Sequence, residues 1–389
     1  MSTYNGEESL RSTIDVAREL FLNYETFRLR EITSRRFKQL DLLRWLQQLA
    51  PLGLFTISPL GSSAEGRTIP LLTFGNGPAT VLLWSQMHGD EPTATMALVD
   101  LLNFLSSERQ HPVAKIITEK LKVLIVPMLN PDGAERFQRR TAQAIDMNRD
   151  ALSFETPEAR LLKEARDRYQ PKFGFNLHDQ DPRYTVGSSK KVSTIALLAP
   201  ALDDARSENS IRLAAKSVAA VFALVMQEFI PGHVSKYDDS FEPRAFGDNI
   251  QRWGTSTVLV ESGGWPGDRD KMFIRKLNYV GLLSSLFSIA SDSHVQAPIS
   301  AYDQLPFSTK YLYDVVLRSA RLKAVETVPP VNVDVGINID ENMNATTGEV
   351  ELVGTILDVG DLSIYGAFRD IRMNGTLLRS EEVRIEGKL

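Results

Sequence analysis

The sequence predicts an α/β protein with a mainly parallel, doubly wound sheet and a small all-β region at its C-terminus. Short apolar runs that resemble strands alternate with segments of helical periodicity, which is typical of such a sheet. After about residue 325 the chain changes to short β-like runs separated by turn residues. We therefore expect a helical segment over 1–50 packed on a main domain over 51–325, and a β-sandwich-like domain over 326–389.

The individual elements follow from local patterns. Residues 8–22 and 36–49 have the apolar spacing of helices. A hairpin is expected from strands at 55–58 and 68–74, joined by a glycine-containing turn and followed by a strand at 80–86. Further strands are expected at 123–127, 173–177, 195–198 and 257–260, and further helices at 157–169, 207–229 and 268–291.

Bulk properties exclude some classes of partner. The 389 residues carry a formal net charge of −5, which gives no reason to expect a nucleic-acid or anionic-membrane partner. There is no cysteine, so disulfides and thiolate chemistry are excluded. The N-terminus lacks the pattern of a signal peptide, and we expect a cytoplasmic protein. A periplasmic or secreted location stays open if the chain has been trimmed, and the oligomeric state stays open as well.

Polar residues gather where the predicted strands end. His88 and Glu91 follow one strand, His178 ends another and Glu261 ends a fourth, while Asn130-Pro131-Asp132-Gly133 follows a third. The crevice beyond the carboxyl ends of the strands is where open α/β sheets bind ligands. Two histidines and a glutamate form a catalytic zinc set with one open position. Glu261 is then the spare carboxylate, suited to act as general base on an attacking water.

Five motifs follow one another along the chain: His88-Gly89-Asp90-Glu91, Asn130-Pro131-Asp132-Gly133, Asp146-Met147-Asn148-Arg149-Asp150, Asn176-Leu177-His178 and Val260-Glu261-Ser262-Gly263-Gly264. In this order they resemble the motifs of the zinc metallocarboxypeptidases, also called funnelins. The resemblance covers roughly residues 50–290 and includes the upstream segment 61–67. Digestive members have an arginine between the first two ligands, whereas Gly89-Asp90 resembles bacterial peptide-trimming members and acyl-amino-acid deacylases.

The resemblance implies roles for the matching residues. One Zn²⁺ is expected on His88, Glu91 and His178, with Glu261 as the base. The other expected roles rest on the same resemblance: Asn148 and Arg149 hold the terminal carboxylate of the substrate, Arg139 stabilises the oxyanion, Arg140 is a neighbouring substrate-binding candidate, and Tyr237 or Tyr184 closes on the substrate. For Arg140, a solvated surface turn is the preferred interpretation.

The predicted function is a metalloprotease that removes a C-terminal amino acid from a peptide. The alternative is an N-acyl amino acid deacylase of the succinylglutamate desuccinylase or aspartoacylase type, acting on a small acylated amino acid. A non-catalytic carboxylate-binding protein is the third possibility. Arg244, Asp248 and Asn249 are candidates for side-chain specificity, with a surface ion pair as the simpler account of Arg244. The remaining histidines are expected at the surface: His111, His233 and His294.

Overall fold

The computed structural model describes residues 2–323, 327–343 and 350–379. The chain divides into two compact units. The first contains the residues up to Gln180 together with Thr194–Phe307, and the second contains Asp181–Ser193 together with the chain from Ser308 onward.

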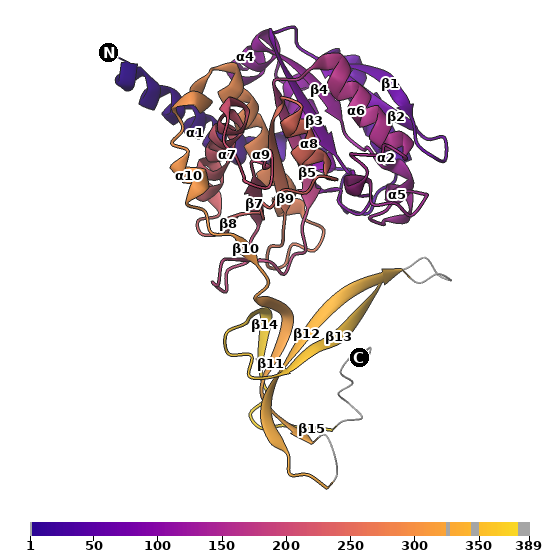
Figure 1. The fold of residues 1–389 in the computed structure, drawn as a ribbon, viewed down its shortest axis with the longest axis vertical. Helices are drawn as coiled ribbons and strands as arrows, with labels where there is room; N and C mark the ends of the chain where they lie inside the picture. Colours follow the sequence, from indigo (N-terminus) through magenta and orange to yellow (C-terminus); the bar gives the residue numbers. More distant parts are fainter. Residues whose placement is uncertain (1, 324–326, 344–349, 380–389) are drawn as a thin grey trace. The chain divides into compact units, whose positions relative to one another are not determined.

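An eight-stranded sheet is the centre of the first unit (Figure 1). The strand order is β1-β2-β4-β3-β5-β9-β7-β8, in which β4, β3, β5 and β9 run parallel. The predicted hairpin is present, and β7 runs antiparallel to β9. The strands are β1 Thr56–Ser62, β2 Thr68–Phe74, β3 Ala79–Ser85, β4 Leu121–Val126, β5 Phe173–Asp179, β7 Ile195–Leu198, β8 Val234–Lys236 and β9 Ser256–Ser262.

Helices cover both faces of this sheet, as the sequence predicts for a doubly wound fold. α1, α2, α3, α4, α7 and α9 contribute to the larger core, whereas α6 and α8 pack on the opposite face. The helices are α1 Ser2–Phe27, α2 Gln39–Leu49, α3 Thr93–Ser107, α4 Pro112–Lys120, α5 Pro131–Arg136, α6 Pro157–Tyr169, α7 Ser210–Phe229, α8 Phe246–Arg252, α9 Met272–Ala290 and α10 Ser300–Asp303.

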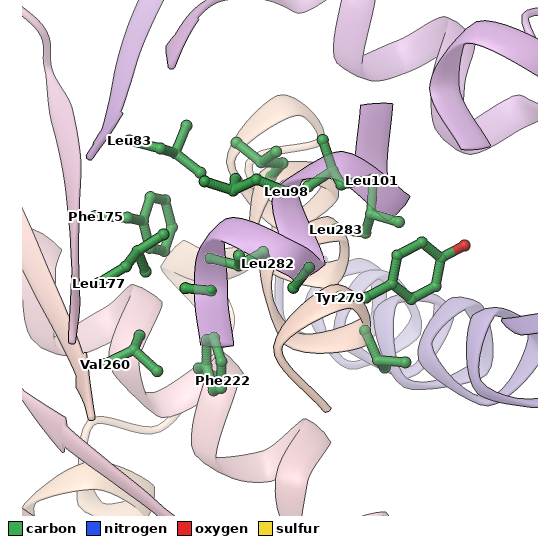
Figure 2. Close-up of a cluster of buried hydrophobic side chains, with 14 of the residues drawn as sticks. Leu83, Leu98, Leu101, Phe175, Leu177, Phe222, Val260, Tyr279, Leu282 and Leu283 are labelled. Carbon is green, nitrogen blue, oxygen red and sulfur yellow. The ribbon is translucent and has the colours of Figure 1, made fainter. Parts of the chain in front are cut away.

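The alternation of side chains along the strands decides which residues enter the core. Figure 2 shows Phe175, Leu177 and Val260 facing apolar side chains of α3, α7 and α9. Successive residues of a strand point to opposite faces, so His178 and Glu261 project away from this cluster. The core thereby fixes the direction in which both polar side chains leave the sheet.

α7 is long and apolar enough to cross a membrane by length and composition alone. Core helices of globular proteins satisfy the same criterion, and 61% of the most apolar window of α7 is buried. Its apolar side chains, including Phe222, pack with those of α9 in the core of the first unit.

The second unit is a β-sheet with an inserted segment from the middle of the chain. Its order is β13-β12-β11-β14, and β15 also pairs with β11. The inserted residues 181–193 contribute β6, which pairs with β10. The strands are β6 Thr185–Val186, β10 Ser308–Thr309, β11 Leu312–Lys323, β12 Val331–Met343, β13 Val350–Gly360, β14 Gly366–Arg372 and β15 Leu377–Arg379.

Two predictions about this region are wrong. The boundary lies between Phe307 and Ser308 rather than between 325 and 326, because β11 belongs to the second unit. The composition shift that suggested 326 coincides with the approach to β12, the second long strand. Among the described residues the strands β11–β15 form a single sheet rather than two packed sheets, so the region is not a β-sandwich.

Candidate active site and metal centre

The candidate metal centre lies where two neighbouring strands of the sheet end. His88 and Glu91 lie in the loop that joins β3 to α3, and His178 is the penultimate residue of β5. These residues are almost inaccessible, with 2%, 7% and 2% of their surfaces exposed. One donor atom from each lies within 4.8 Å of the other two. The structure therefore brings together the three residues that the sequence predicts as metal ligands.

The Glu91 carboxylate lies between the two imidazoles. Its Oε1 is 2.7 Å from Nδ1 of His88, and its Oε2 is 2.7 Å from Nδ1 of His178. Nη1 of Arg139 also lies 3.1 Å from Nδ1 of His88. A proton on this nitrogen serves the Glu91 carboxylate but then points at the Arg139 guanidinium as well, whereas a bare nitrogen can accept from Arg139 but turns its lone pair toward the carboxylate oxygen. A cation at this point resolves the conflict, and the donor set fits zinc.

The charges of the protein groups at this centre depend on one another. Burial opposes the charged form of His88, but the Glu91 and Asp146 carboxylates outweigh burial and raise its pKa to about 9. Burial likewise opposes ionisation of Glu91, yet the two histidines hold its pKa well below the usual value. Burial lowers the pKa of His178. Glu91 is therefore anionic at neutral pH and available as a ligand.

A close contact between two backbone segments fixes the turn that carries His88. A Cβ atom at Gly89 would lie 2.0 Å from the carbonyl carbon of Gly133, so only glycine fits there. Gly133 lies in the first turn of α5, where its N–H donates to Oδ1 of Asn130 at 2.9 Å. The predicted turn at Asn130–Gly133 is thus a capped helix start against which the metal-binding loop packs.

Asp132 connects this helix start to the hairpin. It is fully buried, and its carboxylate accepts hydrogen bonds from the Ser63 hydroxyl at 2.7 Å and the Glu65 N–H at 3.0 Å. Nη1 of Arg67 lies 2.6 Å from the same carboxylate. The upstream segment 61–67 therefore supports the site indirectly, by holding the helix start that contacts Gly89.

Glu261 lies beside the metal centre on the adjacent strand. Its register partner in β5 is His178, so the two residues are immediate neighbours across the sheet. The residue is 7% exposed, and its Oε2 has no hydrogen-bond partner among the described residues. Burial and the nearby Glu91 charge raise the pKa of Glu261 well above the usual value. A buried carboxyl with a raised pKa beside a metal site is suited to accepting and returning a proton.

The structure separates the two adjacent arginines. Nη1 of Arg139 lies 3.2 Å from Oε1 of Glu91, and its Nε and Nη2 donate to Oδ2 of Asp146 at 3.1 and 3.0 Å. Arg140 instead donates from Nη1 to the carbonyl oxygen of Ala144 at 2.9 Å, within its own loop. Arg139 therefore lies at the metal centre, whereas the structure does not bring Arg140 to it.

Asn148 and Arg149 form a short 3₁₀ turn near the N-terminus of α8. Oδ1 of Asn148 accepts a hydrogen bond from the Phe246 N–H at 2.9 Å. Nε of Arg149 lies 3.5 Å from a carboxylate oxygen of Glu242, and its side chain is 39% exposed. Arg244 pairs with the same Glu242 at 2.8 Å, which is the simpler account of Arg244. The guanidinium of Arg149 is thus accessible to a ligand and already lies beside the carboxylate of Glu242.

Tyr237 lies farther along the sheet. It directly follows β8, its N–H donates to the Leu197 carbonyl at 2.9 Å, and β7 lies between β8 and β9. Tyr237 therefore follows a strand that is separated by β7 from the strand of Glu261. Tyr184 belongs to the second unit, where the Lys310 ammonium lies 5.3 Å from its ring centre.

One of the other histidines differs from the prediction of surface residues. His294 is only 5% exposed, and its Nδ1 lies 3.1 Å from a backbone carbonyl of α9. His111 caps α4, where its Nδ1 accepts from the Val113 N–H at 3.2 Å. The His233 ring lies 5.0 Å from that of Trp265. These contacts support the fold. The polar residues that flank each histidine in the sequence do not indicate them.

Two residues at the site received no role from the sequence. Asp146 accepts at Oδ1 from the Asn148 N–H at 3.0 Å, and the same oxygen lies 3.1 Å from Nε2 of His88. A carboxylate on the second nitrogen of a metal-binding histidine fixes the ring. An Asp immediately before a short helical turn is a local capping signal that could have identified Asp146. Lys271, next to Asp179, has no comparable local signal.

Comparison with known proteins agrees with this geometry. Residues 42–189 match the family model described as zinc carboxypeptidase. This part of the chain is therefore similar in sequence to the zinc carboxypeptidases. Carboxypeptidase 2 of Trichophyton rubrum is 31% identical over 138 residues, which cover 33% of this chain and 25% of that protein. The match thus spans about a quarter of the length of such curated relatives.

Solved structures share the fold of a large part of this chain. A metallo-carboxypeptidase from Burkholderia cenocepacia superposes with a TM-score of 0.52 at 17% identity, covering 66% of this chain and 70% of that one. Carboxypeptidase A from Helicoverpa armigera gives a TM-score of 0.52 at 15% identity, covering 72% of this chain and 81% of that one. The predicted carboxypeptidase-type sheet is confirmed.

Proposed function

We propose that this protein is a zinc-dependent hydrolase that removes a C-terminal amino acid from peptides. The observation that carries the proposal is the register of β5 and β9, which sets Glu261 directly beside His178 of the three-residue donor set. A general base next to a His₂Glu metal centre is the minimal apparatus of metal-assisted amide hydrolysis. When bound, zinc supplies Lewis acidity toward the scissile carbonyl and lowers the pKa of a water.

The protein groups supply the remaining chemistry. Glu261 accepts a proton from the attacking water and returns it to the leaving amine nitrogen, for which its raised pKa suits it. The guanidinium of Arg139 lies at the metal centre, where it stabilises the negative charge that develops on the scissile carbonyl oxygen. His88, Glu91 and His178 hold the metal.

The terminal carboxylate of the substrate is assigned to Asn148 and Arg149. Arg149 is exposed enough to receive it, and a guanidinium binds a carboxylate with two parallel hydrogen bonds. Asp146 links the two regions, because it caps the Asn148 turn and also contacts His88 and Arg139. The carboxylate anchor and the metal centre are thereby held at a fixed separation, which favours an exopeptidase over an endopeptidase.

The test is mass spectrometry of a mixed peptide library incubated with the zinc-loaded protein. Stepwise loss of single C-terminal residues, abolished by a chelator, is the expected result. Glu261→Gln should keep bound zinc and lose turnover by about 10²-fold or more, since loss of a general base typically costs that much. Glu158→Gln is the matched control, because Glu158 is also buried but accepts a hydrogen bond from the Ala64 N–H instead.

Two outcomes would contradict the proposal. Near-normal turnover in Glu261→Gln would remove Glu261 from the mechanism. A zinc-loaded protein that trims no peptide would remove peptide hydrolysis itself, and small N-acyl amino acids would then be the next substrates to assay.

A further inference from the structure

A buried lysine lies beyond the ends of the two strands that carry His178 and Glu261. Lys271 immediately precedes α9 and is 5% exposed. Its φ of 57° is left-handed, a conformation that is uncommon for a residue with a side chain. Burying an ammonium group is costly unless it is paired, so such a residue needs a compensating function.

The ammonium group binds both strand ends. Nζ of Lys271 donates to Oδ2 of Asp179 at 3.1 Å and to the carbonyl oxygen of Ser262 at 2.9 Å. Asp179 and Ser262 are register partners in β5 and β9. Asp179 directly follows His178 in the chain, and Ser262 directly follows Glu261. The Lys271 ammonium group therefore joins the two strands at the residues that directly follow His178 and Glu261.

The same cluster reaches the third member of the donor set. The N–H of Asp179 donates to Oε2 of Glu91 at 3.2 Å. The hydroxyl of Thr93, at the start of α3, donates to Oδ2 of Asp179 at 2.6 Å. Asp179 is thus held by Thr93 and Lys271 through its side chain, and it contacts Glu91 through its backbone. Its position fixes the carboxylate that bridges the two histidines.

We propose that Lys271 is a positioning residue that sets the spacing between Glu261 and the metal-binding side chains. The inference rests on the proposed hydrolase function. Without the ammonium group, the buried Asp179 carboxyl loses its cationic partner, and the ends of β5 and β9 lose a shared donor. A misplacement on the order of 1 Å at a catalytic group can cost about a hundredfold in rate.

The experiment is Lys271→Met, which keeps much of the side-chain length and removes the charge. Peptide turnover, KM and zinc affinity are measured on the folded, zinc-saturated protein. We expect kcat to fall about tenfold to a hundredfold with KM near the wild-type value. We also expect zinc to bind about tenfold more weakly, as losses of groups behind metal ligands do.

Two further variants separate positioning from general stability. Lys216→Met removes another buried lysine, which lies on α7 and pairs with Glu208 and Asp303, and kcat should not change. Lys271→Arg retains a cation and should recover most of kcat. A loss confined to thermal stability, with kcat and zinc affinity unchanged in Lys271→Met, would overturn the inference, as would an equal loss of kcat in Lys216→Met.

A second change covers the case in which Lys271→Met does not fold. Thr93→Val removes the other donor to Oδ2 of Asp179 with little change in volume, and should also lower kcat at unchanged KM. Wild-type turnover in Thr93→Val would then overturn the inference. If the wild-type protein cuts no peptide, the proposed function fails together with the inference. If it cuts and Lys271→Met cuts equally well, only the role of Lys271 fails.

Discussion

Substituting Gly89 by alanine should damage the metal centre through a backbone clash. The added Cβ would lie 2.0 Å from the carbonyl carbon of Gly133 and 2.2 Å from the Ala134 nitrogen. Carbon atoms pack at about 3.5 Å, so the loop and α5 must separate by on the order of 1.5 Å. Both contacting atoms belong to the backbone of a capped helix, and rotation of a side chain cannot relieve the clash.

The loop that must move carries both His88 and Glu91, which are three residues apart. Displacing these ligands should weaken zinc binding by about tenfold to a hundredfold, the range found when groups that orient metal ligands are lost. Overpacking should also destabilise the fold by about 1–3 kcal/mol. A chelator-competition titration gives the first quantity, and urea unfolding of the metal-free protein gives the second.

Gly53→Ala is the control for the loss of stability alone. Gly53 has a φ of 71°, and a Cβ there would meet only a side-chain nitrogen of Arg109 at 3.4 Å. Its cost is the left-handed conformation, about 1–2 kcal/mol, and zinc affinity should not change. The reasoning is refuted if Gly89→Ala binds zinc as tightly as the wild type, or if Gly53→Ala weakens zinc binding equally.

Three other substitutions test separate parts of the structure. Arg139→Ala should lower kcat by about 10²–10³-fold in the zinc-loaded protein, whereas Arg140→Ala should leave it near wild type; equal effects in steady-state assays would contradict this. Burial raises the pKa of Asp248 to about 7, so the folded state retains a proton that the unfolded chain releases, and wild-type stability falls as pH rises from about 4 to about 7. Asp248→Asn should therefore gain stability over the wild type across that window, by up to about 4 kcal/mol, and a pH-independent difference in urea unfolding would refute the shift. Arg275→Met should cost about 3–5 kcal/mol in urea unfolding, because both oxygens of buried Asp100 lose a donor, and adding Asp100→Asn should recover part of the loss.

The metal centre could be predicted because its residues follow apolar strands in the sequence. Parallel strands bring their carboxyl ends to one edge, so His88, His178 and Glu261 converge once the strands are assigned. The choice between Arg139 and Arg140 could not be made in this way. Both lie in one irregular loop, and only the hydrogen bonds to Asp146 and Ala144 in the folded chain distinguish them.

The antiparallel strand β7 shows a second limit of the sequence pattern. Alternation of strands and helices predicts parallel neighbours, because a helix carries the chain back across the sheet. Between β5 and β7 the chain instead passes through residues 181–193, which contain β6 and no helix. β7 consequently enters the sheet in the opposite direction, and its apolar sequence Ile195–Leu198 contains no information about that direction.

Residues 181–193 also explain why the domain boundary could not be read from composition. Arg183 holds this segment to the C-terminal strands, with Nε 2.8 Å from Oδ2 of Asp314 and Nη2 2.9 Å from Oδ1 of Asp340. These partners lie more than a hundred residues away in the chain, beyond the reach of any local pattern. This segment begins three residues after the candidate metal ligand His178. Truncating the chain after Phe307 would therefore remove the C-terminal strands that hold a loop directly connected to the candidate metal centre. The second unit is therefore not an appendage that can be deleted independently. The chain crosses between the units three times, and the first crossing follows the strand that ends at the candidate metal centre.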